Sequence, residues 1–178
     1  MKKTTNVVWG GRFEEESSDL LKKINNSIKF DYHLALEDVE LNLSYASELV
    51  KADLLTVKEF KKIEKALKQI KEKIKQRKFK FSDDFEDVHM NIEMALKKKV
   101  GRIAGKIHTG KSRNDQVVTD VKLWVKKRIE NLIYKIKKIQ KTIIKQSEKN
   151  LRVIMPGFTH SQNAQPITYS HYLLSFFE

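Results

Sequence analysis

Hydrophobic residues recur at steps of three to five along most of the chain, the spacing of one buried helix face. Residues 31–51 carry one such series, and a second follows Thr56, which forms a capping box with Glu59 because each side chain can accept from the other's backbone amide. No run alternates convincingly as a strand would. The pattern therefore predicts an all-α fold. The two series are Leu34, Val39, Leu43, Ala46 and Val50, then Phe60, Ile63, Leu67, Ile70 and Ile74.

A shorter helix is predicted for residues 83–99. Acidic residues from Asp83 to Asp87 fill its expected first turn, and Lys97, Lys98 and Lys99 fill its last. These charges complement the helix dipole, and Gly101 is the expected stop.

The longest hydrophobic stripe follows Asn114 and extends for about 30 residues, roughly 45 Å of helix. A single chain of this length offers few neighbours to cover it, so we expect self-association. Pro156-Gly157 interrupts the helical pattern, and a last helix is expected after Pro166. It reaches Glu178 without a cap, and we expect the chain to be cut in mid-helix.

Composition narrows the class of protein. The net charge is +13, but the 36 basic residues comprise 30 lysines and only 6 arginines. Arginine is the residue that recognises phosphates and bases by paired hydrogen bonds, so we interpret the charge as lysine-rich solubilisation and expect no specific nucleic acid partner. Without cysteine, a signal peptide or a membrane span, the sequence predicts a cytoplasmic protein.

One short motif points to a different class. Residues 105–112 satisfy the phosphate-loop pattern GxxxxGK[ST]. That loop works between a buried strand and a helix, whereas the residues upstream of Gly105 are expected to be helical. We keep a nucleotide hydrolase as a minor alternative.

The same residues also belong to a longer polar segment, HTGKSRNDQVVTD, from His108 to Asp120. Its hydroxyls, amide and guanidinium, placed ahead of a helix N-terminus, could hold carboxylates by several donors at once. It could equally be a capping loop, with Ser112 or Asn114 as N-cap.

Two further segments carry candidate chemistry. MPGFTHSQNAQP, from Met155 to Pro166, places His160 in an irregular stretch as a possible acid or base. In EDVH, His89 precedes Glu93 by one helical turn, a spacing that could ligate a metal. No third ligand follows at a telling spacing, so we expect a local contact instead, with no metal and no cofactor.

Together these segments resemble the argininosuccinate lyase branch of the fumarase/aspartase superfamily. The resemblance runs in order through most of the chain, and its last two segments are long and specific. It is carried by WGGRF at Trp9–Phe13, NNSIKFD at Asn25–Asp31, EDVH at Glu86–His89, HTGKSRNDQVVTD and PGFTHSQNAQP.

The resemblance implies a helical domain over residues 1–113 and the start of a central helical bundle, incomplete, over 114–178. It implies a homotetramer that splits argininosuccinate reversibly into arginine and fumarate. His160 would be the proton-transfer histidine. The implied substrate-binding residues are Ser27, Asn114, Thr159, Arg113, His89 and Gln162. Of these, Arg113, His89 and Gln162 could touch the substrate or only support residues that do. The plainer roles are a turn hydroxyl for Ser27, an N-cap for Asn114 and a salt bridge for Arg113.

The sequence departs from the family pattern in three ways. Lys111 stands where an arginine is usual, and Asp53 stands where a glycine is common after the first long helix. The family's glycine- and serine-rich catalytic loop would lie beyond Glu178. We therefore expect little or no lyase activity from these residues alone. A non-catalytic structural protein related to the δ-crystallins is the alternative.

Overall fold

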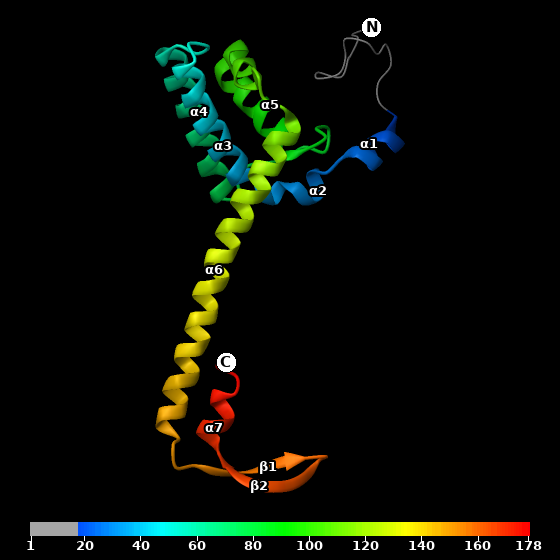
Figure 1. The fold of residues 1–178 in the computed structure, drawn as a ribbon. Helices are drawn as coiled ribbons and strands as arrows, with labels where there is room; N and C mark the ends of the chain where they lie inside the picture. The colour runs from blue at the N-terminus through cyan, green and yellow to red at the C-terminus, as the bar shows by residue number, and fades with distance from the viewer. Residues whose placement is uncertain (1–17) are drawn as a thin grey trace. The chain divides into compact units, whose positions relative to one another are not determined.

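The computed structural model describes residues 18–178 and is built almost entirely of helices (Figure 1). This confirms the predicted fold class, and the segment Trp9–Phe13 lies outside the described residues. The elements are α1 Asp19–Asn25, α2 Ile28–Asp31, η1 Tyr32–Leu34, α3 Ala35–Lys51, α4 Val57–Lys75, α5 Val88–Val100, η2 Gly101–His108, α6 Arg113–Lys149, β1 Ile154–Thr159, β2 Gln162–Thr168 and α7 Tyr169–Leu174.

The described chain forms two compact units, residues 18–124 and residues 125–178, with the division inside α6. The first turns of α6 belong to the first unit because Gln116 and Asp120 are buried within it. The functional boundary predicted between residues 113 and 114 remains a prediction.

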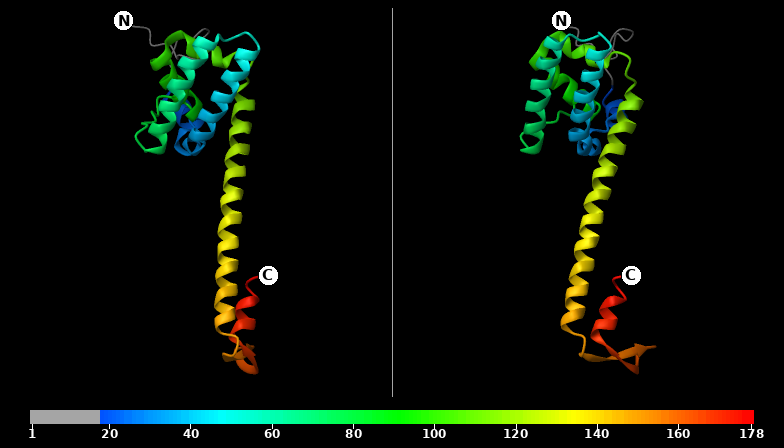
Figure 2. Two further views of the ribbon diagram at one scale, coloured as in Figure 1. Left: turned by 90° about the vertical axis from the view of Figure 1, so that its left-hand side faces the viewer. Right: turned by 60° about the vertical axis from the view of Figure 1, so that its left-hand side comes forward.

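The core of the first unit lies among α3, α4 and α5, which pack side by side (Figure 2). The predicted stripe of α4 supplies Ile63, Leu67 and Ile70, which are almost completely buried. Fully burying an aliphatic side chain of this size contributes about 1.5–3 kcal/mol. The helical spacing thus identified the residues that hold this unit together.

Two of the predicted helix ends are confirmed. Thr56 Oγ1 accepts from the Glu59 amide at 3.2 Å, and a Glu59 carboxylate oxygen accepts from the Thr56 amide at 2.9 Å, so the capping box is present. Gly101 ends α5 with φ of 67°, a conformation in which a side chain would be strained.

Two predicted helix starts are wrong by several residues. Residues 31–34 form the end of α2 and the short 3₁₀ turn η1, and α3 begins only at Ala35. The acidic segment ahead of α5 is a turn, in which the Ser82 hydroxyl bonds to Asp84. Asp87 is the N-cap and accepts from the Met90 amide at 2.6 Å. Short polar side chains here bond locally and compete with the helix.

The phosphate-loop alternative is wrong. Gly105 and the residues around it lie in the 3₁₀ helix η2, directly after α5, and no strand is formed by the described residues upstream. A loop that cradles phosphate needs the strand on one side to aim its amides.

The long helix α6 has 37 residues and is longer than predicted, about 55 Å at 1.5 Å per residue. Many apolar side chains along it are substantially exposed, including Ile129, Leu132 and Ile139. The predicted stripe therefore exists but is not covered within the described chain.

The hairpin β1–β2 corrects the expectation that no strand occurs. Thr159 pairs with Gln162, and a bulge lies at Gly157 between Pro156 and Phe158. A Cβ added at Gly157 would approach the Gln165 carbonyl oxygen to 2.9 Å, so the bulge needs glycine. The two prolines remove ladder donors, and most of the side chains are exposed, so the sequence lacked the usual strand pattern.

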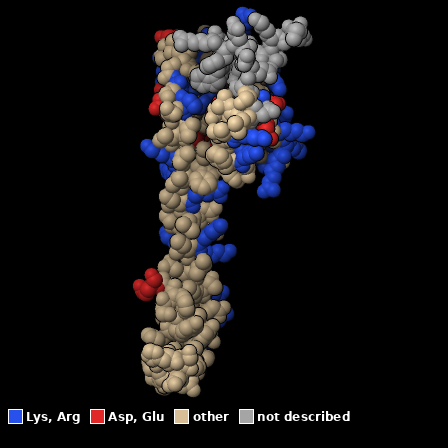
Figure 3. Space-filling view, turned by 90° about the vertical axis from the view of Figure 1, so that its right-hand side faces the viewer, with Lys and Arg blue, Asp and Glu red and all other residues tan. Residues whose placement is uncertain are grey.

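No described helix is long and apolar enough to cross a membrane. Lysine and arginine side chains occur at several separate places on the face drawn in Figure 3. The hairpin and α7 carry none, because no lysine or arginine follows Arg152.

Candidate functional site

The seven predicted site residues are divided between the two units. Ser27, His89, Arg113 and Asn114 lie in the first, and Thr159, His160 and Gln162 lie in the hairpin of the second.

Ser27 lies where α2 meets the N-terminus of α5. Its hydroxyl donates to Asp31 Oδ2 at 2.6 Å, and its amide donates to the Glu86 carbonyl at 2.8 Å. Asp31 in turn accepts from the Val88 amide in the first turn of α5. The hydroxyl is thus held in a fixed direction, and it remains partly accessible.

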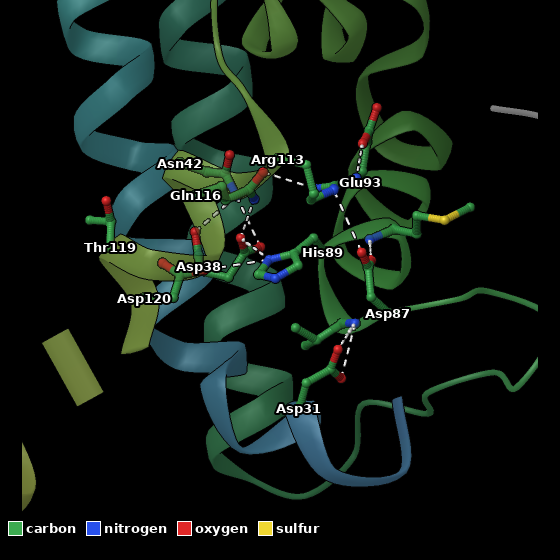
Figure 4. Close-up of polar contacts among 12 residues, drawn as sticks. Asp31, Asp38, Asn42, Asp87, His89, Glu93, Arg113, Gln116, Thr119 and Asp120 are labelled. Atoms are coloured by element: carbon green, nitrogen blue, oxygen red, sulfur yellow. Dashed lines mark hydrogen bonds and ion pairs between the residues drawn. The ribbon is translucent and has the colours of Figure 1, made fainter. Parts of the chain in front are cut away.

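His89 lies in the interior of the first unit and not at its surface (Figure 4). Its Nδ1 is 2.8 Å from Asp38 Oδ1 of α3 and 3.4 Å from Asp120 Oδ2 of α6. The local contact expected between His89 and Glu93 is replaced by this pairing across helices. Glu93 lies instead 3.5 Å from Arg113 Nη2.

Asp120 and Asp38 hold opposite protonation states. Burial first, and the nearby Asp38 charge second, together raise the pKa of Asp120 to about 9. Burial acts on Asp38 in the same sense, but hydrogen bonds from His89 and Gln116 outweigh it, so the pKa of Asp38 is lowered. At neutral pH Asp38 is ionised and Asp120 carries a proton, because two adjacent buried carboxylates cannot both be charged.

Two amide side chains link the start of α6 and the loop ahead of it to this buried group. Lys111 Nζ donates to Asn42 Oδ1 at 2.6 Å, and Asn42 Nδ2 donates to Asp38 Oδ2 at 3.0 Å. Arg113 Nη1 donates to Gln116 Oε1 at 2.8 Å, and Gln116 Nε2 donates to Asp38 Oδ1. Partial burial lowers the pKa of Lys111, which the Asp38 charge partly counteracts.

Arg113 also lies 3.5 Å from Asp87 and from Glu93, so its plainer role as a salt bridge is present (Figure 4). Ser112 is the N-cap of α6: its hydroxyl accepts from the Asn114 amide at 3.2 Å. The Asn114 side chain is therefore not the cap. It is exposed on the first turn of α6, where helix amides favour an anion.

In the second unit, Thr159 and Gln162 are the last pair of the hairpin, and His160 and Ser161 form its two-residue loop. Both loop residues have positive φ, 51° and 61°. Two-residue loops of this kind prefer asparagine and glycine, so histidine here is in a strained conformation. Strained residues cluster at functional sites, and the His160 side chain is exposed.

Four site residues were missed from the sequence: Asp38, Asn42, Gln116 and Asp120. Gln116 and Asp120 lie in the quoted segment 108–120, four residues apart on one helix face, which could have indicated a shared inward direction. Asp38 and Asn42 have the same spacing within an apolar helix. Buried polar residues at that spacing were the available signal.

The side chains with metal-ligand chemistry that converge in the described part are Asp38, His89 and Asp120, whose ligand atoms lie within 4.8 Å of one another. Two carboxylates and an imidazole suit a divalent transition metal. Here Asp38 Oδ1 is already bonded by two protein donors, so a cation would have to displace them. The absence of a metal remains a prediction.

The chain is similar in sequence to known lyases. Residues 11–178 match a protein family described as lyases. The chain is 47% identical over 174 residues to an argininosuccinate lyase of Ehrlichia ruminantium (strain Welgevonden), which covers 98% of this chain and 38% of that protein. It is 45% identical over 171 residues to the argininosuccinate lyase of Limosilactobacillus reuteri, covering 96% and 37%. The chain thus spans less than two fifths of the length of these relatives.

Solved structures give the same fold. An EDDS lyase in complex with formate superposes with a TM-score of 0.66 at 24% identity, covering 82% of this chain and 28% of that one. A fumarate lyase from Mesorhizobium sp. BNC1 superposes with a TM-score of 0.63 at 15% identity, covering 90% and 37%.

Proposed function

The chain belongs to the lyase family that includes the argininosuccinate lyases, and from this membership we propose that it is part of an enzyme splitting argininosuccinate reversibly into arginine and fumarate. The observation that carries the proposal is the 47% identity over 98% of the chain, which takes in both polar segments, 108–120 and 155–166.

The reaction is an elimination, and its chemistry needs three kinds of group. A base removes a proton from the carbon beside a carboxylate, donors stabilise the charge that develops there, and an acid protonates the departing nitrogen. We assign proton transfer to His160, directly or through a relay. A positioned acid or base contributes about 10²–10⁴-fold, so loss of His160 should be severe.

We assign carboxylate binding to the exposed start of α6 and to the place where α2 meets the N-terminus of α5. The Asn114 side chain and the Ser27 hydroxyl are the proposed direct contacts, with Thr159 and Gln162 beside His160 in the hairpin. The cations Lys111 and Arg113 give the α6 end the charge that attracts an anion. Buried His89 acts on this end through Asp38 and not by touching substrate.

We also propose that the working enzyme is a cytoplasmic homotetramer in which different subunits contribute to each site. Support comes from the exposed apolar side chains along α6, such as Val125, Leu132 and Ile139, which need a partner surface. The absence of cysteine fits a reducing compartment.

These 178 residues alone are proposed to be inactive. No glycine- and serine-rich stretch matching the family's third catalytic segment occurs among them. Identical copies cannot supply to one another a loop that none of them contains.

A fusion tests the proposal. Residues 1–178 replace the matching segment of the Ehrlichia ruminantium lyase, and fumarate release from argininosuccinate is followed by ultraviolet absorbance. We expect turnover from the fusion and none from residues 1–178 alone. A folded, tetrameric fusion without turnover would favour the non-catalytic structural alternative instead.

A further inference from the structure

Asp38 is the centre of the buried polar group in the first unit (Figure 4). Its side chain is completely buried, and it accepts from His89, Gln116 and Asn42. A buried carboxylate costs several kcal/mol unless donors satisfy it, and here donors come from three different helices. Asp38 therefore ties α3, α5 and α6 together at one point.

Two of those donors lead outward, one to the loop that precedes α6 and one to the first residue of α6. Asn42 and Gln116 each donate an N–H to Asp38 and accept, at their other end, from Lys111 and Arg113 respectively. A side-chain amide is neutral and can donate through its nitrogen while it accepts through its oxygen. Each cation is thereby linked to Asp38 through one amide and is not directly paired with it.

We propose that Asp38 is a positioning residue for the carboxylate-binding end of α6, acting on Lys111 through Asn42 and on Arg113 through Gln116. The two links fix the direction of the loop and of the first turns of the helix, and so the direction in which Asn114 is presented. The effect on substrate rests on the proposed function, whereas the effect on the helix does not.

The arrangement has a chemical consequence. Because Asn42 stands between Lys111 and Asp38, Lys111 is held in place without a direct ion pair to Asp38, whereas Arg113 also lies 3.5 Å from Asp87 and from Glu93. The bond to Asn42 needs one of the three N–H groups of the Lys111 ammonium. A direct ion pair with Asp38 would fix the cation but cancel much of its attraction for a carboxylate.

The first test follows amide hydrogen exchange in the 178-residue chain. Asn42→Asp keeps the acceptor for Lys111 but removes the N–H given to Asp38, and Gln116→Met removes both ends without adding charge. The matched control is Asn91→Asp, a buried amide on α5 that bonds to the backbone of Ser82 and Asp87 and not to Lys111 or Arg113.

We expect exchange of the amides of residues 116–120 to rise about tenfold or more in the first two variants, as for loss of a hydrogen bond to a charged group. The control should leave these amides within about twofold of the parent. Unchanged exchange in both test variants, or an equal rise in the control, would overturn the proposal.

The second test measures kinetics in the fusion described above. Gln116→Met should raise KM for argininosuccinate about tenfold with a smaller change in kcat, because binding of the carboxylate is affected first. The Asn91→Asp fusion should keep the parent KM. A fall in kcat at unchanged KM would contradict the assigned role. A parent fusion without turnover would instead defeat the proposed function, and hydrogen exchange would still decide the role of Asp38.

Discussion

Asp38 and Asp120 both approach the same nitrogen of His89, at 2.8 and 3.4 Å. One N–H can serve only one of them well, and Asp38 is the nearer. No other described side chain donates to Asp120, although its carboxyl group is completely buried. A proton on Asp120 removes the repulsion between the two carboxylates and lets Asp120 donate toward Asp38, in line with its raised pKa.

The pH dependence of stability follows from this pair. An unfolded aspartate loses its proton near 3.8, whereas Asp120 keeps its proton until about pH 9 in the folded chain. Between those values the folded state binds one proton more, so the free energy of unfolding falls as pH rises. The slope is at most about 1.4 kcal/mol per pH unit. Asp38, whose pKa is lowered, makes the free energy of unfolding rise with pH, but only at pH values below the ordinary aspartate pKa.

Asp120→Asn should flatten this slope, because asparagine is neutral at every pH and can donate to Asp38 as the protonated acid does. The measurement is urea denaturation of the chain across that pH range. Asp115→Asn, an exposed change on the same helix, is the control and should keep the slope. An Asp120→Asn chain with the parental slope would show that the proton resides elsewhere.

Asp53→Gly should raise the free energy of unfolding by about 0.5–1 kcal/mol. Asp53 follows the end of α3 with φ of 57°, which glycine adopts without strain and which explains why glycine is usual there. Arg77, with φ of 56° after α4, gives an independent second site for the same change. Asp53→Ala should lower stability instead, and a stabilising alanine would refute the backbone explanation.

His160→Asn should keep the hairpin turn while it removes the imidazole ring proposed for proton transfer. Asparagine tolerates positive φ in a two-residue hairpin loop, so β1 and β2 should remain paired. The ring is lost, and turnover by the fusion should fall by about 10²-fold or more. Nuclear magnetic resonance of the hairpin amides checks the fold. Ser161→Asn, the same change one residue later, should keep turnover near the parent value.

Lys111→Arg should be tolerated, because the guanidinium can still donate to Asn42 and restores the residue usual in the family. Lys111→Met should lower the free energy of unfolding by about 1–3 kcal/mol by leaving the Asn42 carbonyl without its donor. Urea denaturation of both variants checks this. Equal loss in both would mean that the position of the Lys111 ammonium over the Tyr45 ring, 5.4 Å from its centroid, matters more than the bond to Asn42.

The local sequence pattern was enough to predict the α4 stripe, the capping box at Thr56 and the stop at Gly101, because these depend on residue types within a few positions of one another. It failed at residues 83–87, where short polar side chains bond within their own turns, and at residues 31–34, which form the end of α2 and a 3₁₀ turn. It also missed the hairpin. That element has two prolines and little buried apolar surface, so it carries no strand signal.

The motifs by themselves selected the lyase family and the polar segments around Asn114 and His160, because the order of residue types along a chain is a property of sequence. Only the tertiary structure decided that His89 pairs with Asp38 and Asp120, residues 51 and 31 positions away in opposite directions along the chain. Such a buried charge cluster depends on which helix faces meet, and periodicity identifies a buried face without naming the face opposite. The proton on Asp120 follows from that meeting, since a carboxyl group alone in water would have lost it.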